Sequence, residues 1–135
     1  MVRFNKKILV IDDEILIRDV VREFFEIEGY TVIGAQDGQE ALRILENETF
    51  MVIFLDLKLP DITGAELCKQ IRKSNPLAMI YAFTGYTNYY NQMDCRTAGF
   101  DDFIVKPVDM GMLLKAVQDA FKKIESRKAN ESGLP

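Results

Sequence analysis

Histidine is absent from all 135 residues of the sequence. This absence excludes serine–histidine–aspartate and cysteine–histidine catalysis, zinc sites of the HExxH type and a role as a phosphohistidine donor. Cysteine is nearly as scarce, because Cys68 and Cys95 are the only two and do not form a CxxC pair. They are too few for a thiolate cluster, and we expect both to pack as small residues on helix faces. Any bound metal must therefore be a hard cation held by oxygen atoms.

The chain also lacks an excess of positive charge and a long apolar run. Its 17 Lys and Arg against 21 Asp and Glu give a formal net charge of −4, which argues against direct nucleic-acid binding through bulk positive charge. The longest apolar stretch, 77–83, is too short to cross a bilayer. The run 8–11 ends in two aspartates, so it is not the apolar core of a signal peptide. We therefore expect one cytoplasmic domain without membrane insertion.

Short apolar runs alternate with longer amphipathic segments along the chain. These runs predict strands at residues 7–11, 31–35, 51–55, 78–83 and 103–105. Apart from Lys7, the first, third and fourth runs are continuously apolar, which is typical of parallel strands covered on both faces.

Apolar residues spaced three or four positions apart predict helices between these strands. The first helix is indicated by Leu16, Val20, Phe24 and Ile27, and the last by Leu113, Val117, Phe121 and Ile124. Two more are indicated by Ala41, Leu42 and Leu45 and by Leu67 and Ile71. Helix boundaries are expected at Gly29, at the capping box 37–40, at Ala98-Gly99 for a fourth helix, and at Asp109. The alternation predicts an α/β fold, a doubly wound parallel sheet with helices on both faces.

Five polar residues follow or end four of the predicted strands. They are Asp12 and Asp13 after the first strand, Asp56 after the third, Thr84 at the end of the fourth and Lys106 after the fifth. Ligands bind outside the carboxyl ends of the strands in such a sheet, so we expect these side chains to meet there. Three carboxylates in one crevice repel each other, and Mg²⁺ bound by them would remove that repulsion.

The same residues suit phosphoryl chemistry. Lys106 offers a positive charge and Thr84 a hydroxyl group to phosphoryl oxygens. A carboxylate beside a metal ion and a lysine can attack phosphorus and form an acyl phosphate. Simple helix capping by Asp12 and Asp13 is the alternative for that pair, whereas an unpaired carboxylate at Asp56, inside an apolar run, would be costly.

Four segments carry a family resemblance. They are Ile-Leu-Val-Ile-Asp-Asp-Glu at 8–14, Leu-Asp-Leu-Lys-Leu-Pro-Asp-Ile-Thr-Gly at 55–64, Thr84-Gly85, and Ile-Val-Lys-Pro at 104–107. In this order, over roughly residues 6–125, they resemble the receiver domain of response regulators in two-component signalling. The resemblance implies a flavodoxin-like (βα)5 fold of five parallel strands in the order 2-1-3-4-5. We expect the receiver domain to span 1–125, and 126–135 to be a disordered tail or a linker.

The resemblance also implies roles for individual residues. Asp56 would be the phosphoacceptor that takes a phosphoryl group from a histidine of a sensor kinase or a histidine phosphotransfer domain. Asp13 would bind Mg²⁺ directly, Asp12 largely through water, and Lys58 through its main-chain carbonyl. Lys106 and Thr84 would hold the phosphoryl oxygens, and Lys106-Pro107 would be a cis peptide.

A switch is implied as well. Thr84 would move toward the phosphoryl group and Phe103 would swing in behind it, which would change the face made by the fourth helix, fifth strand and fifth helix. This face would contact a downstream protein, and Phe103 as a plain core residue is the alternative. Lys58 and Tyr86 flank the crevice and could shield the acyl phosphate or simply point to solvent. Tyr86 also belongs to a tyrosine cluster, with Tyr89 and Tyr90, that fits either a partner surface or ordinary packing.

The first helix bears a further implied contact. Ile15 and Leu16 follow the acidic pair, on the edge where the family docks the helical phosphotransfer domain of the kinase. Only one of the two fits the apolar stripe of the helix, so the other is expected to be an exposed contact.

Several functions compete with a stand-alone receiver or a receiver cut from a larger regulator. The chain could be a phosphorelay intermediate that passes the phosphoryl group to a histidine phosphotransfer protein, or an interaction module that works without phosphorylation. A haloacid-dehalogenase-type phosphatase would need a second aspartate where Lys58 stands. A flavodoxin-like electron carrier would bind phosphate at the acidic loop 12–14, which would repel it. We expect a signalling domain rather than an enzyme, one that catalyses only its own phosphorylation and dephosphorylation.

Overall fold

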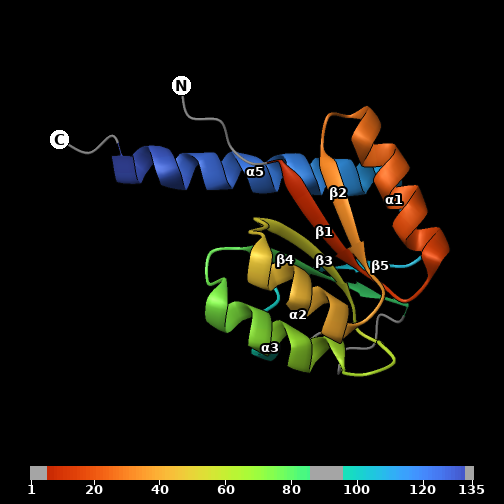
Figure 1. Cartoon of the computed structure of the whole chain (residues 1–135). Helices are drawn as coiled ribbons and strands as arrows, with labels where there is room; N and C mark the ends of the chain where they lie inside the picture. Colours follow the sequence, from red (N-terminus) through yellow and green to blue (C-terminus); the bar gives the residue numbers. More distant parts are fainter. Residues whose placement is uncertain (1–5, 86–95, 133–135) are drawn as a thin grey trace.

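The computed structural model describes residues 6–85 and 96–132 and places five parallel strands in one sheet, in the order β2-β1-β3-β4-β5 (Figure 1). The strands are β1 (Lys7–Ile11), β2 (Thr31–Ala35), β3 (Val52–Asp56), β4 (Met79–Thr84) and β5 (Asp102–Val105). All residues of β3 and β4 are buried, as expected for central strands covered on both faces. The predicted fold class and strand order are confirmed.

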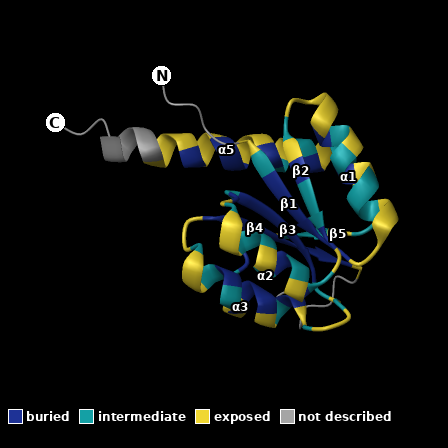
Figure 2. Cartoon of the chain, viewed as in Figure 1, coloured by how far each residue is buried: buried dark blue, intermediate teal, exposed yellow. Residues whose placement is uncertain are grey.

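Helices cover both faces of this sheet. They are α1 (Ile15–Ile27), α2 (Gly38–Asn47), α3 (Gly64–Ser74) and α5 (Met110–Ser132). One core cluster joins the sheet to α2 and α3, and includes the buried Cys68 in the packing role predicted for it. The other joins the opposite face to α1 and α5 (Figure 2). Among the described residues, no helix is long and apolar enough to cross a membrane.

The predicted helix boundaries at 29, 37 and 109 have the expected geometry. The Asp37 carboxylate accepts a hydrogen bond from the backbone N–H of Glu40 at 2.8 Å, and Asp109 accepts one from Met112 at 3.1 Å. Gly29 follows α1 with a φ of 92°, a conformation that favours glycine. These contacts satisfy N–H groups at the first turns of α2 and α5, which would otherwise lack partners.

The buried face of α1 differs from the stripe that predicted the helix. Val21 and Phe25 are buried, whereas Leu16 is 73% exposed and Ile27 is 86% exposed. Apolar residues come in adjacent pairs along this helix, so two stripes with the same spacing exist one residue apart. The stripe one position later faces the sheet, and the earlier one is exposed at Leu16, Val20 and Ile27, whereas Phe24 is half-buried against the core.

The last helix is longer than the sequence indicated. Leu113, Val117, Phe121 and Ile124 are buried as predicted, but α5 continues to Ser132. Residues 126–132 are therefore helical and not disordered, and the other alternative, a linker, stays a prediction. Their sequence lacks apolar periodicity but also lacks Gly and Pro before Gly133, so helix propensity is enough to extend a helix that is already anchored.

The predicted fourth helix is described only at its end. Residues 96–98 are helical, and Gly99 follows with a φ of 106°, in agreement with the expected boundary. Tyr86, Tyr89, Tyr90 and Cys95 lie outside the described residues.

Candidate functional site

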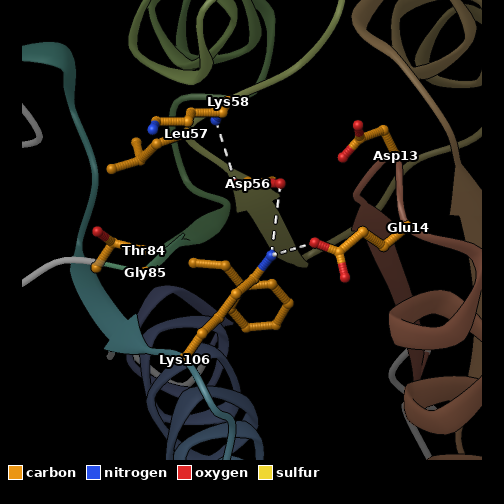
Figure 3. Close-up of a pocket in the computed structure, with 9 residues that line it drawn as sticks. Asp13, Glu14, Asp56, Leu57, Lys58, Thr84, Gly85 and Lys106 are labelled. Atoms are coloured by element: carbon orange, nitrogen blue, oxygen red, sulfur yellow. Dashed lines mark hydrogen bonds and ion pairs between the residues drawn. The ribbon is translucent and has the colours of Figure 1, made fainter.

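The strand register brings four strand ends together at one edge of the sheet. Ile11 pairs with Leu55, Asp56 with Phe83, and Thr84 with Val105. The residues that follow these positions therefore meet at the same edge. A cavity of about 350 Å³ opens there (Figure 3). It is lined by Asp13, Glu14, Asp56, Leu57, Lys58, Phe83, Thr84, Gly85 and Lys106.

Asp56 lies at the floor of this cavity and is only 8% exposed. Its Oδ1 accepts a hydrogen bond from the backbone N–H of Lys58 at 3.2 Å, and its Oδ2 lies 3.5 Å from Lys106 Nζ. Burial raises the pKa of the Asp56 carboxyl, and the negative charge of Asp12 adds to that rise. The Lys58 N–H and Lys106 lower this pKa without reversing the net shift. Asp56 is thus a carboxylate whose charge is poorly compensated.

Lys106 is shared among three carboxylates. Its Nζ lies 3.0 Å from Asp12 Oδ2, 3.5 Å from Asp56 Oδ2 and 3.9 Å from Glu14 Oε1. Burial would lower the pKa of the ammonium group, but the hydrogen bond and charge of Asp12, with Asp56 and Glu14, raise it overall. Lys106 therefore stays protonated and supplies the positive charge of the site. The Lys106-Pro107 peptide bond is cis, as predicted.

The three aspartates form a group that fits a hard cation. One carboxylate oxygen each from Asp12, Asp13 and Asp56 lies within 4.8 Å of the others. Asp12 is fully buried and Asp13 is exposed, so the group opens from the protein interior to solvent. Oxygen ligands in this number, with room for water, are those that Mg²⁺ prefers. The residues present fit the predicted metal ion.

The loop after Asp56 is held by contacts that the sequence did not indicate. The Asp61 carboxylate accepts hydrogen bonds from the backbone N–H groups of Gly38 and Gln39, both at 2.9 Å. These bonds lower the pKa of Asp61 and tie the loop to the first turn of α2. A Cβ atom at Gly64 would lie 2.5 Å from the Asp56 carbonyl oxygen, so only glycine lets α3 begin this close to Asp56.

The residues predicted to switch occupy different positions relative to the cavity. Thr84 is 6% exposed and lines the cavity opposite Asp13 (Figure 3). Phe103 is half-buried and packs against the core cluster on the α2 and α3 side. It also lines a second cavity, of about 380 Å³, together with Val105 and Met112. Tyr86, the predicted modulating residue, is outside the described residues.

Glu14 is a residue of the cavity to which sequence reasoning gave no role. It follows the acidic pair directly, so its place in the run 12–14 is the signal that could have singled it out. Asp61 carried no comparable signal, because its partners are backbone N–H groups of another segment.

Comparison with known proteins gives a consistent result. Residues 8–118 match the family described as the response regulator receiver domain. The probable transcriptional regulator ycf27 of Porphyridium aerugineum is 33% identical over 95% of this chain and 53% of its own length. The alkaline phosphatase synthesis transcriptional regulatory protein PhoP of Bacillus subtilis is 40% identical over 76% of this chain and 43% of its own. The chain thus spans about half the length of these relatives.

Solved structures agree in fold. A CheY-like response regulator receiver domain protein from Methanospirillum hungatei has a TM-score of 0.86 and 35% identity, covering 90% of this chain and 98% of its own. Chemotaxis response regulator CheY4 of Vibrio cholerae has a TM-score of 0.81 and 32% identity, covering 87% of this chain and 99% of its own.

Proposed function

Because the chain belongs to the response regulator receiver domain family, we propose that it accepts a phosphoryl group on Asp56 from a phosphohistidine of a sensor kinase. A receiver is a signalling domain, and the phosphorylated form would be the signal. One observation carries the assignment of the acceptor. Asp56 lies on the floor of the cavity with a carboxylate oxygen 3.5 Å from Lys106 Nζ, within the group of three aspartates.

The proposed reaction is a single phosphoryl transfer. An Asp56 carboxylate oxygen attacks phosphorus, the P–N bond to the histidine of the donor breaks, and the imidazole nitrogen keeps the electron pair. The product is an acyl phosphate on Asp56. The domain catalyses its own phosphorylation, and the later attack of water on phosphorus returns free phosphate and the carboxylate.

The residues of the cavity would position the transferring group and balance its charge. Lys106 and the Thr84 hydroxyl would bind phosphoryl oxygens, since both line the cavity beside Asp56. Asp12, Asp13, Asp56 and the Lys58 carbonyl would hold Mg²⁺. When bound, the ion would neutralise charge on the phosphoryl oxygens, where most catalysis of phosphoryl transfer lies.

Phosphorylation would be transmitted through β5. A bond between the Thr84 hydroxyl and a phosphoryl oxygen exists only in the phosphorylated state, so it favours one of two packings of Phe103. Phe103 has no hydroxyl group, so packing alone would carry the change. The half-buried ring beside the cavity lined by Val105 and Met112 supports this proposal. A downstream protein would read the α5 and β5 face together with the fourth helix.

The donor would dock on the exposed side of α1. Ile15, Leu16 and Val20 are 61%, 73% and 50% exposed, and Ile15 follows directly after the cavity residue Glu14. Exposed apolar side chains beside a reactive group suit a helical partner. The expectation that one of Ile15 and Leu16 joins the core is wrong, since both face solvent.

Lys58 remains a proposed modulating residue. Its side chain is exposed and its residue lines the cavity, so a long cation there would shield the acyl phosphate from water. Measuring the lifetime of the phosphorylated protein with Lys58→Ala tests this, and an unchanged lifetime would contradict it.

Intact mass measurement tests the proposed function. The full chain is incubated with acetyl phosphate and Mg²⁺, and we expect the mass of one phosphoryl group to be added. Asp56→Asn should add none, whereas Asp119→Asn, which changes an exposed carboxylate on α5, should behave like the wild type. Chelation of Mg²⁺ should prevent the addition. An unmodified wild type, or an Asp56→Asn protein that still gains the group, would contradict the proposal.

A further inference from the structure

The mouth of the cavity carries a negative charge from Glu14, in addition to the three aspartates of the metal group. Glu14 occupies the N-cap position of α1, but its side chain makes no capping hydrogen bond. Its backbone N–H donates to Asp12 Oδ1 at 2.9 Å, which fixes the main chain. The side chain extends toward the cavity, with Oε1 3.9 Å from Lys106 Nζ (Figure 3).

Glu14 and a phosphoryl group would both require the same cation. Among the described residues, Lys106 is the cation that pairs with the carboxylates of the site. A phosphodonor entering the cavity needs Lys106 for its own phosphoryl oxygens. It must therefore either displace Glu14 from Lys106 or remain beside an uncompensated carboxylate. Displacing Glu14 costs its ion pair with Lys106, whereas remaining beside Glu14 costs a repulsion that grows with the negative charge of the donor.

We propose that Glu14 is a specificity-determining residue that disfavours small, highly charged phosphodonors. The proposal rests on the proposed function of Asp56 and concerns its choice of donor. A small donor such as acetyl phosphate carries two negative charges at neutral pH and makes no contacts outside the cavity that would offset the repulsion from Glu14. A phosphohistidine presented by a docked protein brings binding energy from the contacts on α1, which a small molecule lacks.

The size of the effect follows from exposure and distance. The Glu14 side chain is 61% exposed, so solvent screens its charge and the repulsion is modest. We expect its removal to raise the rate constant by about two- to threefold for each negative charge on the donor. That is about four- to ninefold for doubly charged acetyl phosphate and about two- to threefold for singly charged phosphoramidate.

The experiment compares these two donors on the full chain with saturating Mg²⁺. Second-order rate constants are measured by intact mass for wild type, Glu14→Gln and Glu14→Lys. The ratio of the acetyl phosphate rate to the phosphoramidate rate should rise in the order Glu, Gln, Lys at position 14. The matched control is Glu23→Gln, an exposed glutamate on the same helix that does not line the cavity, and it should leave the ratio unchanged. Raising the salt concentration to about 1 M should reduce the differences among variants.

The outcomes separate this proposal from the function on which it rests. A wild type that neither donor modifies refutes phosphorylation of Asp56. Phosphorylation of the wild type with an unchanged donor ratio in both Glu14 variants refutes the role of Glu14. A variant with impaired packing would react more slowly with both donors and leave the ratio of their rates unchanged. Such a result counts against the proposal and cannot be mistaken for support. Urea unfolding of each variant verifies that it is folded.

Discussion

Replacing Asp56 by Asn should stabilise the unphosphorylated protein in the absence of Mg²⁺, although it removes the proposed acceptor. The Asp56 side chain is buried beside the charge of Asp12, and its pKa is raised, mainly by burial. A carboxyl group with a raised pKa in the folded protein is less favourable as an anion there than in the unfolded chain. At neutral pH the native charge at position 56 therefore lowers the free energy of unfolding.

The magnitude follows from the neighbouring charges. The oxygens of Asp12 and Asp56 lie within 4.8 Å, which corresponds to a repulsion of about 3.5 kcal/mol at an effective dielectric constant of about 20. Lys106 Nζ at 3.5 Å offsets this with an attraction of about 4.7 kcal/mol on the same scale. The attraction exceeds the repulsion by about 1.2 kcal/mol on this scale, which is less than the several kcal/mol that the desolvation of a buried carboxylate costs. We expect Asp56→Asn to raise the free energy of unfolding by about 1 to 2 kcal/mol.

The assay is urea unfolding of both proteins over a range of pH, with Mg²⁺ removed. The folded pKa of Asp56 lies above its ordinary value of 3.8, so the penalty is full above the folded pKa and absent below about 3.8. The advantage of Asp56→Asn should be largest at pH 7 and shrink as the pH falls through the raised pKa. Asp119→Asn, with its exposed side chain, should show no such advantage. A variant no more stable than the wild type at pH 7, or a gain that grows on acidification, would refute the reasoning.

Three further outcomes are expected in urea unfolding. Arg72→Ala should lower the free energy of unfolding by about 2 to 4 kcal/mol, because the guanidinium donates at 2.6–3.1 Å to the carbonyls of residues 76, 78 and 99 and to the Asp101 carboxylate. Lys73→Ala is the control, and an equal loss of stability in both variants would contradict the role of Arg72. Gly64→Ala should cost about 1 to 3 kcal/mol and slow phosphorylation. Gly111→Ala, where the nearest atom is a carboxylate oxygen of Asp109 at 3.3 Å, should not destabilise. Mg²⁺ at about 100 times its Kd should raise wild-type stability by about 2.7 kcal/mol, and no gain would speak against a metal site.

The sequence predicted the sheet well because each central strand is apolar except at one of its ends. Continuous runs such as 51–55 leave few alternatives to a buried parallel strand, and the strand ends then place Asp12, Asp56 and Lys106 at one edge without any knowledge of distances. The position of the site therefore followed from topology alone.

The orientation of α1 could not be predicted, because Val20-Val21 and Phe24-Phe25 give two stripes of equal quality. The choice between them depends on how the helix crosses the sheet. The contacts of Asp61 could not be predicted either, since they depend on groups that meet only in the folded chain, whereas Glu14 could have been singled out by its place after the acidic pair. The helical residues 126–132 were missed for a different reason, namely that no apolar pattern marks a helix extended by propensity alone.

The attachment of Asp61 to α2 limits how the segment between Asp56 and α3 can evolve. With one end fixed at β3 and the carboxylate of Asp61 seated on two amide groups of α2, the distance that the intervening residues must span is set by the fold. Side chains in this segment that make no contact with the core, the cavity or α3 can change, as long as their backbone conformation is kept. An insertion or deletion would break the hydrogen bonds of Asp61 to the backbone of α2. Relatives that share this contact should therefore vary in sequence between Asp56 and α3 but keep the same number of residues in that segment.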